Sequence, residues 1–288
     1  MNGEKCERNE EQVRAWFACM QTREGAGGDA GTEPAAVPEG PAGMNVRDGD
    51  GRTALHWACA VGHAGHVAWL TAHGAALAAA DDAGWTPLMC AASAAHPAAA
   101  VALLRAAPTP AARAALVRAA VPRAGTTALH HACTRAAPAL VRVLLAAGAD
   151  PAARDAHGTT PLHRCAAAAV APDDAKSAAM CACAEALADA AAAAPGAAGR
   201  AEGLSEEWAE GVLPAVGADV RARAARRLAA RTNSAGETAL HVAVQMRALA
   251  LVHLLVAWGA DTTVRDSDGK TPAQYAVTAE LRRALNPM

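Results

Sequence analysis

The sequence predicts an all-α repeat solenoid, in which antiparallel helix pairs stack and hairpin-shaped fingers join one pair to the next. The first observation is a signature of Thr, then Ala or Pro, then usually Leu-His, which recurs six times along 288 residues. Three of the five gaps between its threonines are 33 residues long, a period typical of stacked two-helix repeats. The second observation is a glycine 21 residues after the signature Thr in three copies. The threonines are Thr53, Thr86, Thr127, Thr160, Thr238 and Thr271, and the glycines are Gly74, Gly148 and Gly259.

The signature explains where each first helix begins. A Thr hydroxyl can accept a hydrogen bond from the free N–H groups of a helix start, and Pro at the next position lacks an N–H that would have no partner there. The third residue of the signature faces the seam between neighbouring repeats, so we expect it in one continuous core. The residues concerned are Leu55, Leu88, Leu129, Leu162 and Leu240.

The second helices are predicted from apolar residues at helical spacing. Two of them carry this pattern clearly, one through Val141, Leu144 and Leu145 and the other through Leu251, Leu254 and Leu255. The glycine that follows such a helix adopts the left-handed conformation that a side chain resists. No single helix pair can bury its apolar face alone, so the stability of the chain comes from stacking neighbours.

The period and the signature resemble the ankyrin repeat, a hairpin finger followed by a helix-turn-helix. The resemblance implies about six repeats, over residues 44–288. Ahead of them, capping-box chemistry at residues 9–12 precedes apolar residues at amphipathic spacing, which predicts an N-terminal capping helix over residues 1–22. Residues 23–43 are rich in Gly, Ala, Pro and Glu without periodicity, and we predict a flexible linker there.

Two insertions lengthen the period, at about residues 107–124 and 171–232. In the first, Ala107-Pro108 stands where the helix-ending glycine is expected. We predict that an extra helix from about Pro110 to Ala120 fills this insertion.

The second insertion has a predicted helix from Asp173 to Ala194 but no settled register. Gly217 resembles the helix-ending Gly148, which would make Asp173 to Ala194 an added helix and place the end of repeat four at Gly217. Pro214 argues against this, because it would then lie inside the helix being ended. The register of residues 171–232 therefore stays open.

Composition favours a protein-binding chain over one that binds nucleic acid or membranes. The formal net charge is −2, so no overall field attracts nucleic acid or an anionic lipid surface. No stretch of about 18 residues is apolar enough to span a bilayer. The N-terminus also lacks the apolar segment of a secretion signal. We expect a soluble intracellular monomer, located in the cytoplasm and compatible with the nucleus.

An arginine cluster is the local exception to this charge balance. It lies in the second insertion, close in sequence to three glutamates, and comprises Arg221, Arg223, Arg226, Arg227 and Arg231. One interpretation is a solvated helix with internal charge pairing. The other is a docking surface for an acidic partner. Both stay open.

Cysteine spacing does not indicate disulfides or a metal site. Cys59 and Cys133 fall at the same offset from their signature Thr, a core position of the first helix. Cys181 and Cys183 form a lone Cys-x-Cys without a second pair at zinc-finger spacing. We expect reduced, structural cysteines.

The signature histidines are interpreted as structural, since each should brace its turn against the neighbouring repeat. They are His56, His130, His163 and His241. The sequence has no Gly-rich phosphate loop, no His-Glu-x-x-His and no Gly-x-Ser-x-Gly. We predict no enzyme activity, no cofactor and no metal, because an enzyme would need a site within the insertion at 171–232.

A more specific resemblance lies in the first two repeats. The runs RTALHWAC at 52–59 and DDAGWTPL at 81–88 are similar to the gankyrin family of proteasome regulatory-particle assembly chaperones. The ankyrin consensus does not require Arg52, Trp57 or the Asp-Asp-Ala-Gly-Trp run. His163-Arg164 resembles the fifth repeat of that family, and six repeats after a capping helix match its count of seven.

The resemblance implies binding without catalysis. Members of the family bind the C-terminal domain of one ATPase subunit in the base of the 19S regulatory particle on their concave face, and so delay its docking onto the 20S core. By this resemblance the partner-binding residues of the chain are Asp48, Asp50, Arg52, Trp57, Asp81, Asp82, Trp85, His131 and Arg164. The retinoblastoma-pocket motif of vertebrate gankyrin has no counterpart, because residues 242–246 read VAVQM.

Each site residue also has a structural interpretation. Asp81 and Asp82 could bind the partner or stabilise their turn, and Trp57 could pack on the neighbouring helix. For Trp85 we favour contact with a partner, since an indole at a hairpin tip has little core in which to pack. We expect lysines at both aspartates to weaken binding with little change in melting temperature. The competing function is a generic ankyrin adaptor in signalling or trafficking, with a partner unrelated to the proteasome.

Overall fold

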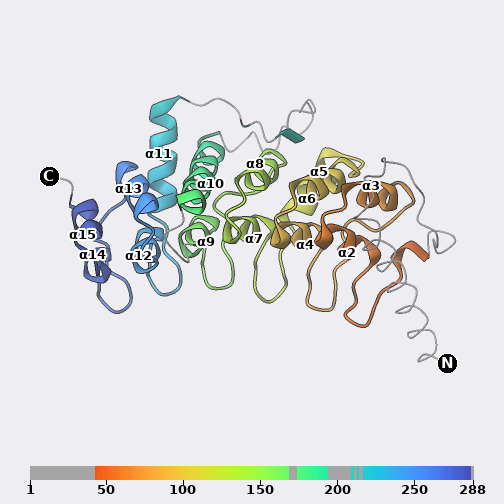
Figure 1. Cartoon of the computed structure of the whole chain (residues 1–288), viewed down its shortest axis with the longest axis horizontal. Helices are drawn as coiled ribbons and strands as arrows, with labels where there is room; N and C mark the ends of the chain where they lie inside the picture. The colour runs from red at the N-terminus through yellow and green to blue at the C-terminus, as the bar shows by residue number, and fades with distance from the viewer. Residues whose placement is uncertain (1–42, 169–173, 194–208, 211–212, 214–216, 287–288) are drawn as a thin grey trace. The chain divides into compact units, whose positions relative to one another are not determined.

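The computed structural model describes residues 43–168, 174–193, 209–210, 213 and 217–286 (Figure 1). The predicted capping helix at 1–22 and residues 23–42 of the predicted linker lie outside this part of the chain. The described residues form helices and isolated bridges, such as the antiparallel one between Thr232 and Thr238, with no strand among them. They belong to two compact units, Met1–Val121 and Pro122–Met288, which we call unit 1 and unit 2.

Unit 1 contains two helix pairs and one extra helix. Its first helices are α2 (Ala54–Val61) and α4 (Pro87–Ala94), and its second helices are α3 (Ala64–Ala72) and α5 (Pro97–Arg105). The short 3-10 helix η1 (Gly43–Asn45) precedes them, and α6 (Pro110–Arg118) follows. First helices pack on each other, as do second helices. The extra helix predicted from Pro110 to Ala120 is confirmed as α6, whose first turn is capped by the Thr109 hydroxyl.

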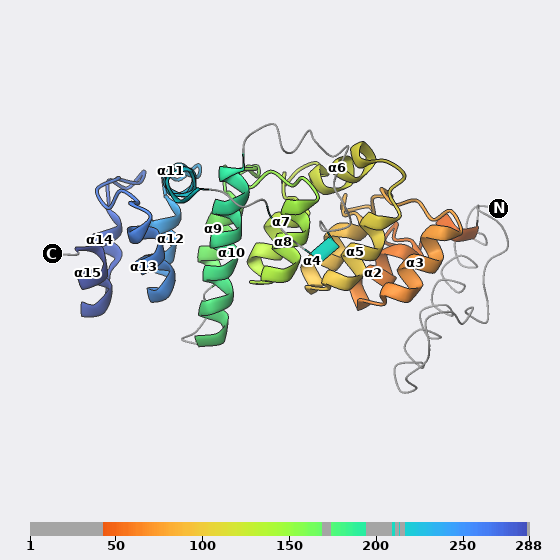
Figure 2. The same cartoon turned by 90° about the horizontal axis from the view of Figure 1, so that it is seen from above.

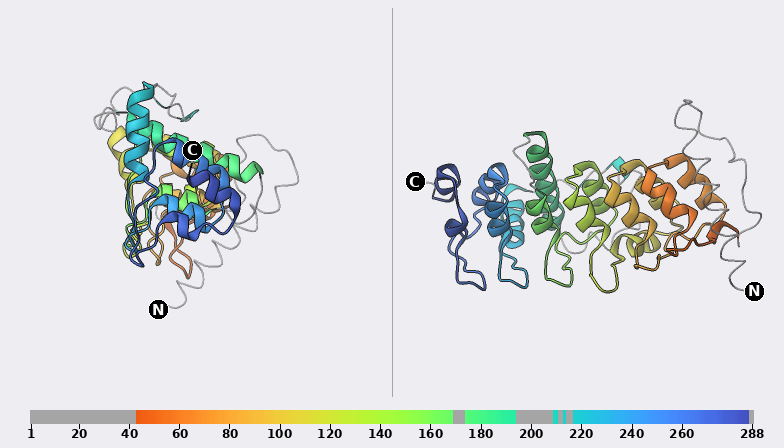
Figure 3. Two further views of the ribbon diagram at one scale, coloured as in Figure 1. Left: turned by 90° about the vertical axis from the view of Figure 1, so that its left-hand side faces the viewer. Right: turned by 60° about the horizontal axis from the view of Figure 1, so that its bottom comes forward.

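Unit 2 contains four helix pairs and one further helix. Its first helices are α7 (Ala128–Thr134), α9 (Pro161–Ala167), α12 (Ala239–Gln245) and α14 (Pro272–Tyr275). Its second helices are α8 (Pro138–Ala146), α10 (Asp174–Ala192), α13 (Leu249–Ala257) and α15 (Ala279–Leu285). The helix outside this pattern is α11 (Ala218–Ala229). The hairpins of unit 2 project beyond its first helices, as the right-hand view of Figure 3 shows.

The cores of both units follow the signature. Leu55 and Leu88 in unit 1 and Leu129, Leu162 and Leu240 in unit 2 are all buried, which confirms the core prediction for each of them. Of the six apolar residues singled out on second helices, five are buried and Leu254 is half-buried. The six cysteines among the described residues are all free, and Cys59 and Cys133 are buried as predicted.

The glycines that follow second helices have the predicted backbone conformation. Gly74, Gly148 and Gly259 have φ of 89°, 99° and 78°. At Gly148 this turn lets the next amide, Ala149 N, donate to Leu144 O at 2.9 Å, so the last free carbonyls of α8 gain partners.

The structure settles the register of the second insertion. α10 packs against α8, α9 and α13, so the helix predicted from Asp173 to Ala194 is the second helix of repeat four and not an added one (Figure 2). Gly217, with φ of −62°, is the N-cap of α11 and does not end a helix. The alternative that placed the end of repeat four at Gly217 is therefore wrong, and the added helix is α11.

None of the helices in the described ranges is both long enough and apolar enough to cross a bilayer.

Candidate functional site

The fingers are built around a carboxylate or amide oxygen that holds the turn. In five fingers the Oδ1 atom of an Asp or Asn accepts hydrogen bonds from the backbone N–H groups two and four residues later. The residues are Asp48, Asp81, Asp155, Asn233 and Asp266. For Asp81 these bonds come from Ala83 N at 3.0 Å and Trp85 N at 2.7 Å. Because Asp and Asn favour such local bonds, this position fixes the shape of the finger.

The second oxygen of the same carboxylate binds a first helix. Asp48 Oδ2 accepts from Trp57 Nε1 at 2.8 Å, Asp155 Oδ2 from Arg164 Nη2 at 2.6 Å, and Asp266 Oδ2 from Tyr275 Oη at 2.6 Å. Each donor lies nine residues after its acceptor. Asp81 is the exception, because Arg52 Nε from the preceding finger donates to its Oδ2 at 3.2 Å. Two of the donors on first helices, Trp57 and Arg164, are side chains that the sequence analysis assigned to a partner.

Within each unit, backbone hydrogen bonds also join one finger to the next. In unit 1, Asp82 N donates to Asp50 O at 3.1 Å. In unit 2 the corresponding bonds run from Ala156 N to Ala124 O at 2.8 Å, from Ser234 N to His157 O at 2.8 Å and from Ser267 N to Ala235 O at 2.9 Å. The fingers of each unit therefore form a row with fixed spacing.

The signature histidines complete this frame, as predicted. In repeat one, His56 Nδ1 accepts from Thr53 N at 3.0 Å, and the proton on Nε2 is donated to Trp85 O of the next finger at 3.1 Å. His130, His163 and His241 do the same with Thr159 O, Glu237 O and Lys270 O. Burial lowers the pKa of His56, His130 and His163, so these rings stay neutral, as the two bonds require.

The unit 1 fingers gather seven of the nine predicted site residues. Arg52 lies over the Trp57 ring, 5.1 Å from its centroid, a cation–π geometry. Trp85 is half-buried on the adjacent finger. Asp50 and Asp82 are exposed at the two finger tips, whose backbones are hydrogen-bonded to each other. We call Asp50, Asp82, Arg52, Trp57 and Trp85 the unit 1 finger face.

Asp48 and Asp81 are held in the fingers themselves. Asp81 is only 6% exposed and accepts three hydrogen bonds, so a lysine there would break the turn. The expectation that reversal of both Asp81 and Asp82 leaves stability unchanged is not compatible with this geometry. Asp82, which is exposed, does not have that constraint.

The two remaining predicted residues, His131 and Arg164, belong to unit 2. Arg164 pairs with the buried carboxylate of Asp155. Burial, helped by the positive charge of Arg164, lowers the pKa of His131 to about 4. His131 is therefore neutral at physiological pH.

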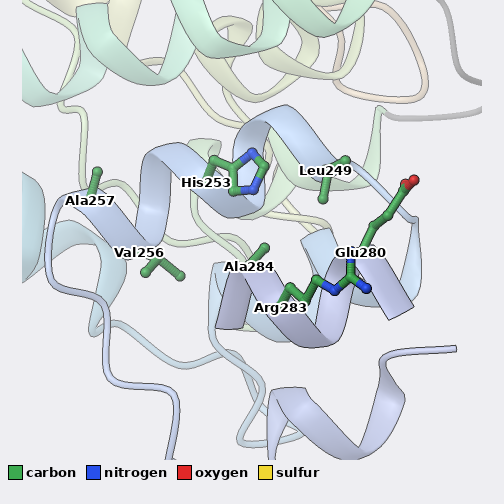
Figure 4. Close-up of a pocket in the computed structure, with 7 residues that line it drawn as sticks. All are labelled: Leu249, His253, Val256, Ala257, Glu280, Arg283 and Ala284. Carbon is green, nitrogen blue, oxygen red and sulfur yellow. The ribbon is translucent and has the colours of Figure 1, made fainter. Parts of the chain in front are cut away.

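In the part of the chain that the structure describes, no cluster of three His, Cys, Asp or Glu side chains is placed to hold a metal ion. A groove of about 590 Å³ runs between α13 and α15 (Figure 4). Its lining is mostly aliphatic, with His253 from α13 and Glu280 and Arg283 from α15 at its edge. We assign no chemistry to it, because these three polar groups do not converge on one point in Figure 4.

The double role of the finger aspartates was missed by sequence reasoning, although the sequence carries a signal for it. An Asp or Asn five residues before the signature Thr, together with a Gly two residues before it, recurs in five copies. The Gly takes the left-handed conformation at the end of the turn, with φ of 74° at Gly51 and 82° at Gly84. This second motif precedes five of the six signature copies, and Pro122 takes the place of the Asp or Asn in the remaining one.

Comparison with known proteins gives one family for most of the chain. A family model of ankyrin repeats in three copies matches residues 35–114, and one of ankyrin repeats in many copies matches residues 120–165 and 226–276. Together the matched ranges cover more than half of the chain.

A short stretch of the chain resembles a proteasome protein. The 26S proteasome non-ATPase regulatory subunit 10 of Rattus norvegicus is 52% identical over 40 residues, which are 14% of this chain and 17% of that protein.

Two solved structures resemble the chain over nearly its whole length. The ankyrin repeat domain of Bcl-3, a member of the IkappaB family, has a TM-score of 0.58 at 21% identity and covers 96% of this chain and 94% of its own. The human ASB11 ankyrin repeat domain has a TM-score of 0.59 at 18% identity, with 96% and 95% covered. At these identities the likeness shows the fold alone.

Proposed function

Because the chain belongs to the ankyrin-repeat family, whose domains are typically protein-binding scaffolds, we propose that it is an assembly chaperone of the proteasome 19S regulatory particle. In this proposal it binds the C-terminal domain of a base ATPase subunit through the unit 1 finger face. The observation that carries the proposal is the 52% identity over 40 residues to a proteasome regulatory subunit. The gankyrin-like runs at 52–59 and 81–88 point to the same family.

The geometry of the unit 1 finger face supports a charge-complementary contact. Asp50 and Asp82 place two carboxylates on neighbouring finger tips, where they would steer a basic surface towards the protein. Trp85 stands beside them with its ring half-buried, and half-buried indoles are common at the centre of protein interfaces. Arg52 and Trp57 are held by Asp81 and Asp48, so little side-chain freedom is lost when a partner docks on them.

In unit 2, His131 and Arg164 are the residues proposed to contact a partner. Arg164 presents part of its guanidinium to solvent while Asp155 holds the rest, so it can offer further N–H groups to a carboxylate of the partner. Neutral His131 would contribute packing and no charge at physiological pH.

The second candidate is a generic adaptor whose partner is unrelated to the proteasome. It is favoured by the small share of the chain, 14%, that matches the proteasome subunit, against the nearly complete fold-level likeness to other ankyrin domains. Both candidates use the finger row, so only the identity of the partner separates them.

Binding of the purified chain to each purified C-terminal domain of the base ATPase subunits tests the proposal. We expect one domain to bind, and the double variant Asp50→Lys, Asp82→Lys to weaken that binding at least about tenfold, or about 1.4 kcal/mol, because two attractions become repulsions. Isothermal titration calorimetry at two salt concentrations measures the loss and its screening.

The matched control is Asp219→Lys, Glu280→Lys, which changes the net charge equally at two exposed sites of unit 2. It should bind within about twofold of the wild type if position matters more than total charge. If the wild type binds none of the ATPase domains, the proposed proteasome role is wrong and the generic adaptor is the remaining candidate. If the Asp50→Lys, Asp82→Lys variant binds with the affinity of the wild type, the binding site does not include the tips of the unit 1 fingers.

A further inference from the structure

Helix α11 is a surface feature outside the ankyrin framework. Ala224, Ala225, Leu228 and Ala229 are buried on one side of it, and the helix packs on α10. It lies on the side of unit 2 away from the fingers (Figure 1). Its opposite side carries the arginine cluster for which two interpretations were open.

Two of the five arginines have a structural contact. Arg221 Nε lies 2.6 Å from Asp189 Oδ1 of α10. The guanidinium of Arg226 lies against the turn at Gly259, where a Cβ atom would come within 2.8 Å of it. This places Arg226 beside the C-terminal end of α13, where a cation is favoured by the helix dipole. The solvated-helix interpretation fits these two residues.

The other three arginines form an exposed stripe. Arg223, Arg227 and Arg231 follow one another at intervals of four residues, so they lie on one face of the helix. Arg231 keeps this alignment beyond the helix end, because its N–H still donates to Leu228 O at 3.2 Å. None of the three forms an ion pair with another described residue, and Arg223 Nε donates only to Asp219 O at 3.3 Å. We call these residues the α11 arginine stripe.

The stripe is unfavourable for the folded chain alone. Like charges four residues apart on a helix repel each other, and Asp219, the carboxylate one turn before Arg223 on α11, forms no ion pair with it. Val220, one turn earlier on the same side, is 45% exposed, which is unusual for a large apolar side chain in this structure. An exposed row of one apolar and three cationic side chains is the pattern expected of a surface that a partner covers.

We propose that the α11 arginine stripe is a second docking surface, which binds an acidic segment of a partner protein. Carboxylates at alternate positions of an extended segment are spaced about 7 Å apart, close to the roughly 6 Å between successive arginines on the helix. Arginine suits this role because its planar fork can hold a carboxylate through two hydrogen bonds.

A protein segment fits better than nucleic acid. Affinity for nucleic acid comes from many phosphate contacts, whereas the stripe has three cations on a chain of net charge −2. α11 also lacks an aromatic residue on which a base could stack. The surface is separate from the unit 1 finger face, so this inference does not depend on the proposed proteasome role.

The probe for the test is a fluorescein-labelled peptide of about 12 residues with Glu at every second position, titrated with the full chain and followed by fluorescence anisotropy. At low ionic strength the variant Arg223→Gln, Arg227→Gln, Arg231→Gln should bind at least about tenfold more weakly than the wild type, because it loses all three cations of the stripe. Its circular dichroism and melting temperature should stay near those of the wild type, since the three side chains are exposed.

The control variant is Arg118→Gln, Arg135→Gln, Arg142→Gln, which removes the same charge from exposed positions on α6, at the C-cap of α7 and on α8. It should keep the wild-type affinity within about twofold. If both variants lose the same affinity for the peptide, the effect comes from net charge alone and the proposal is wrong. Absence of peptide binding by the wild type would also overturn the proposal, as would tighter binding of a 12-nucleotide RNA or of phosphatidylserine vesicles than of the peptide.

Discussion

The finger side and the second-helix side of unit 2 respond differently to the same insertion. On the finger side, His163 Nε2 reaches Glu237 O at 3.0 Å and Ser234 N reaches His157 O at 2.8 Å, although 74 or more residues separate each pair in sequence. On the other side, α10 has 19 residues where the neighbouring second helices have nine, and α11 is added beside it. The row of fingers defines the repeat, whereas the second-helix side tolerates new elements.

The physical reason lies in the kind of contact on each side. Finger contacts are directional hydrogen bonds, and those of a buried histidine such as His163 cost about 1–3 kcal/mol when left unmade. The contact between α10 and α11 is formed by Ala and Leu side chains, and apolar contacts of this kind can be extended by any helix with a small apolar face. An insertion can therefore enter between α10 and the next finger without breaking the frame.

Acid should expose this difference most strongly, because the neutral histidines lie on the finger side. Burial makes the pKa of His56, His130 and His163 lower in the folded chain than in the unfolded one, so unfolding takes up protons at mildly acidic pH. The contribution of these histidines to the free energy of unfolding should be complete at pH values above about 6.5, the pKa of histidine in the unfolded chain. It should decrease as the pH drops below that value, by up to about 1.4 kcal/mol per pH unit for each histidine. Urea unfolding at pH 7.5, 6.5 and 5.5 measures the slope.

The last repeat supplies the control for this prediction. There Gln274 stands in the place of the histidine, and its Oε1 accepts from Thr271 N at 2.8 Å. A variant with Gln at positions 56, 130 and 163 should keep the caps but lose most of the slope. An unchanged slope in that variant would show that other groups cause the acid sensitivity.

Substitution of a finger glycine should have the next largest effect. Gly125 has φ of +67°, and a Cβ there would lie 2.9 Å from Ala156 N of the next finger. Gly125→Ala combines left-handed strain with a backbone clash and should cost about 3 kcal/mol. Gly269 has φ of +74° but open space around it, so Gly269→Ala should cost only about 1 kcal/mol. Chemical denaturation measures the free energy of unfolding of both variants. If the two variants lose the same free energy, the close spacing of the fingers does not contribute to stability.

Truncation inside α11 should have a smaller and more local effect. Leu228 is 3% exposed and packs α11 onto unit 2, so Leu228→Ala should cost that helix about 2 kcal/mol. Hydrogen exchange should show faster exchange in α11 and unchanged protection at the finger amides of Ser234 and Ser267. Loss of protection at those amides would mean that the second-helix side supports the fingers after all.

Much of this architecture follows from local sequence. The signature Thr, the left-handed Gly and the periodic Leu predicted the helix pairs, the turns and the core, because each acts within its own repeat. The gankyrin-like runs lie on and beside the unit 1 fingers, and α6 was predicted from the lengthened period and from Ala107-Pro108 in the place of the helix-ending glycine. These features depend on neighbours within a few residues, which a sequence displays directly.

Tertiary structure alone decided how the charged residues are used and where the second insertion belongs. Asp50 and Asp82 are exposed while Asp48 and Asp81, of the same type and on the same fingers, are engaged in turns, a difference set by hydrogen bonds from residues up to 29 positions away. Gly217 reads like a helix end but begins α11, because α10 had already filled the space between α8 and α13. Local chemistry fixes what each repeat can form, whereas the packing of distant segments fixes which of those groups remain free to meet a partner.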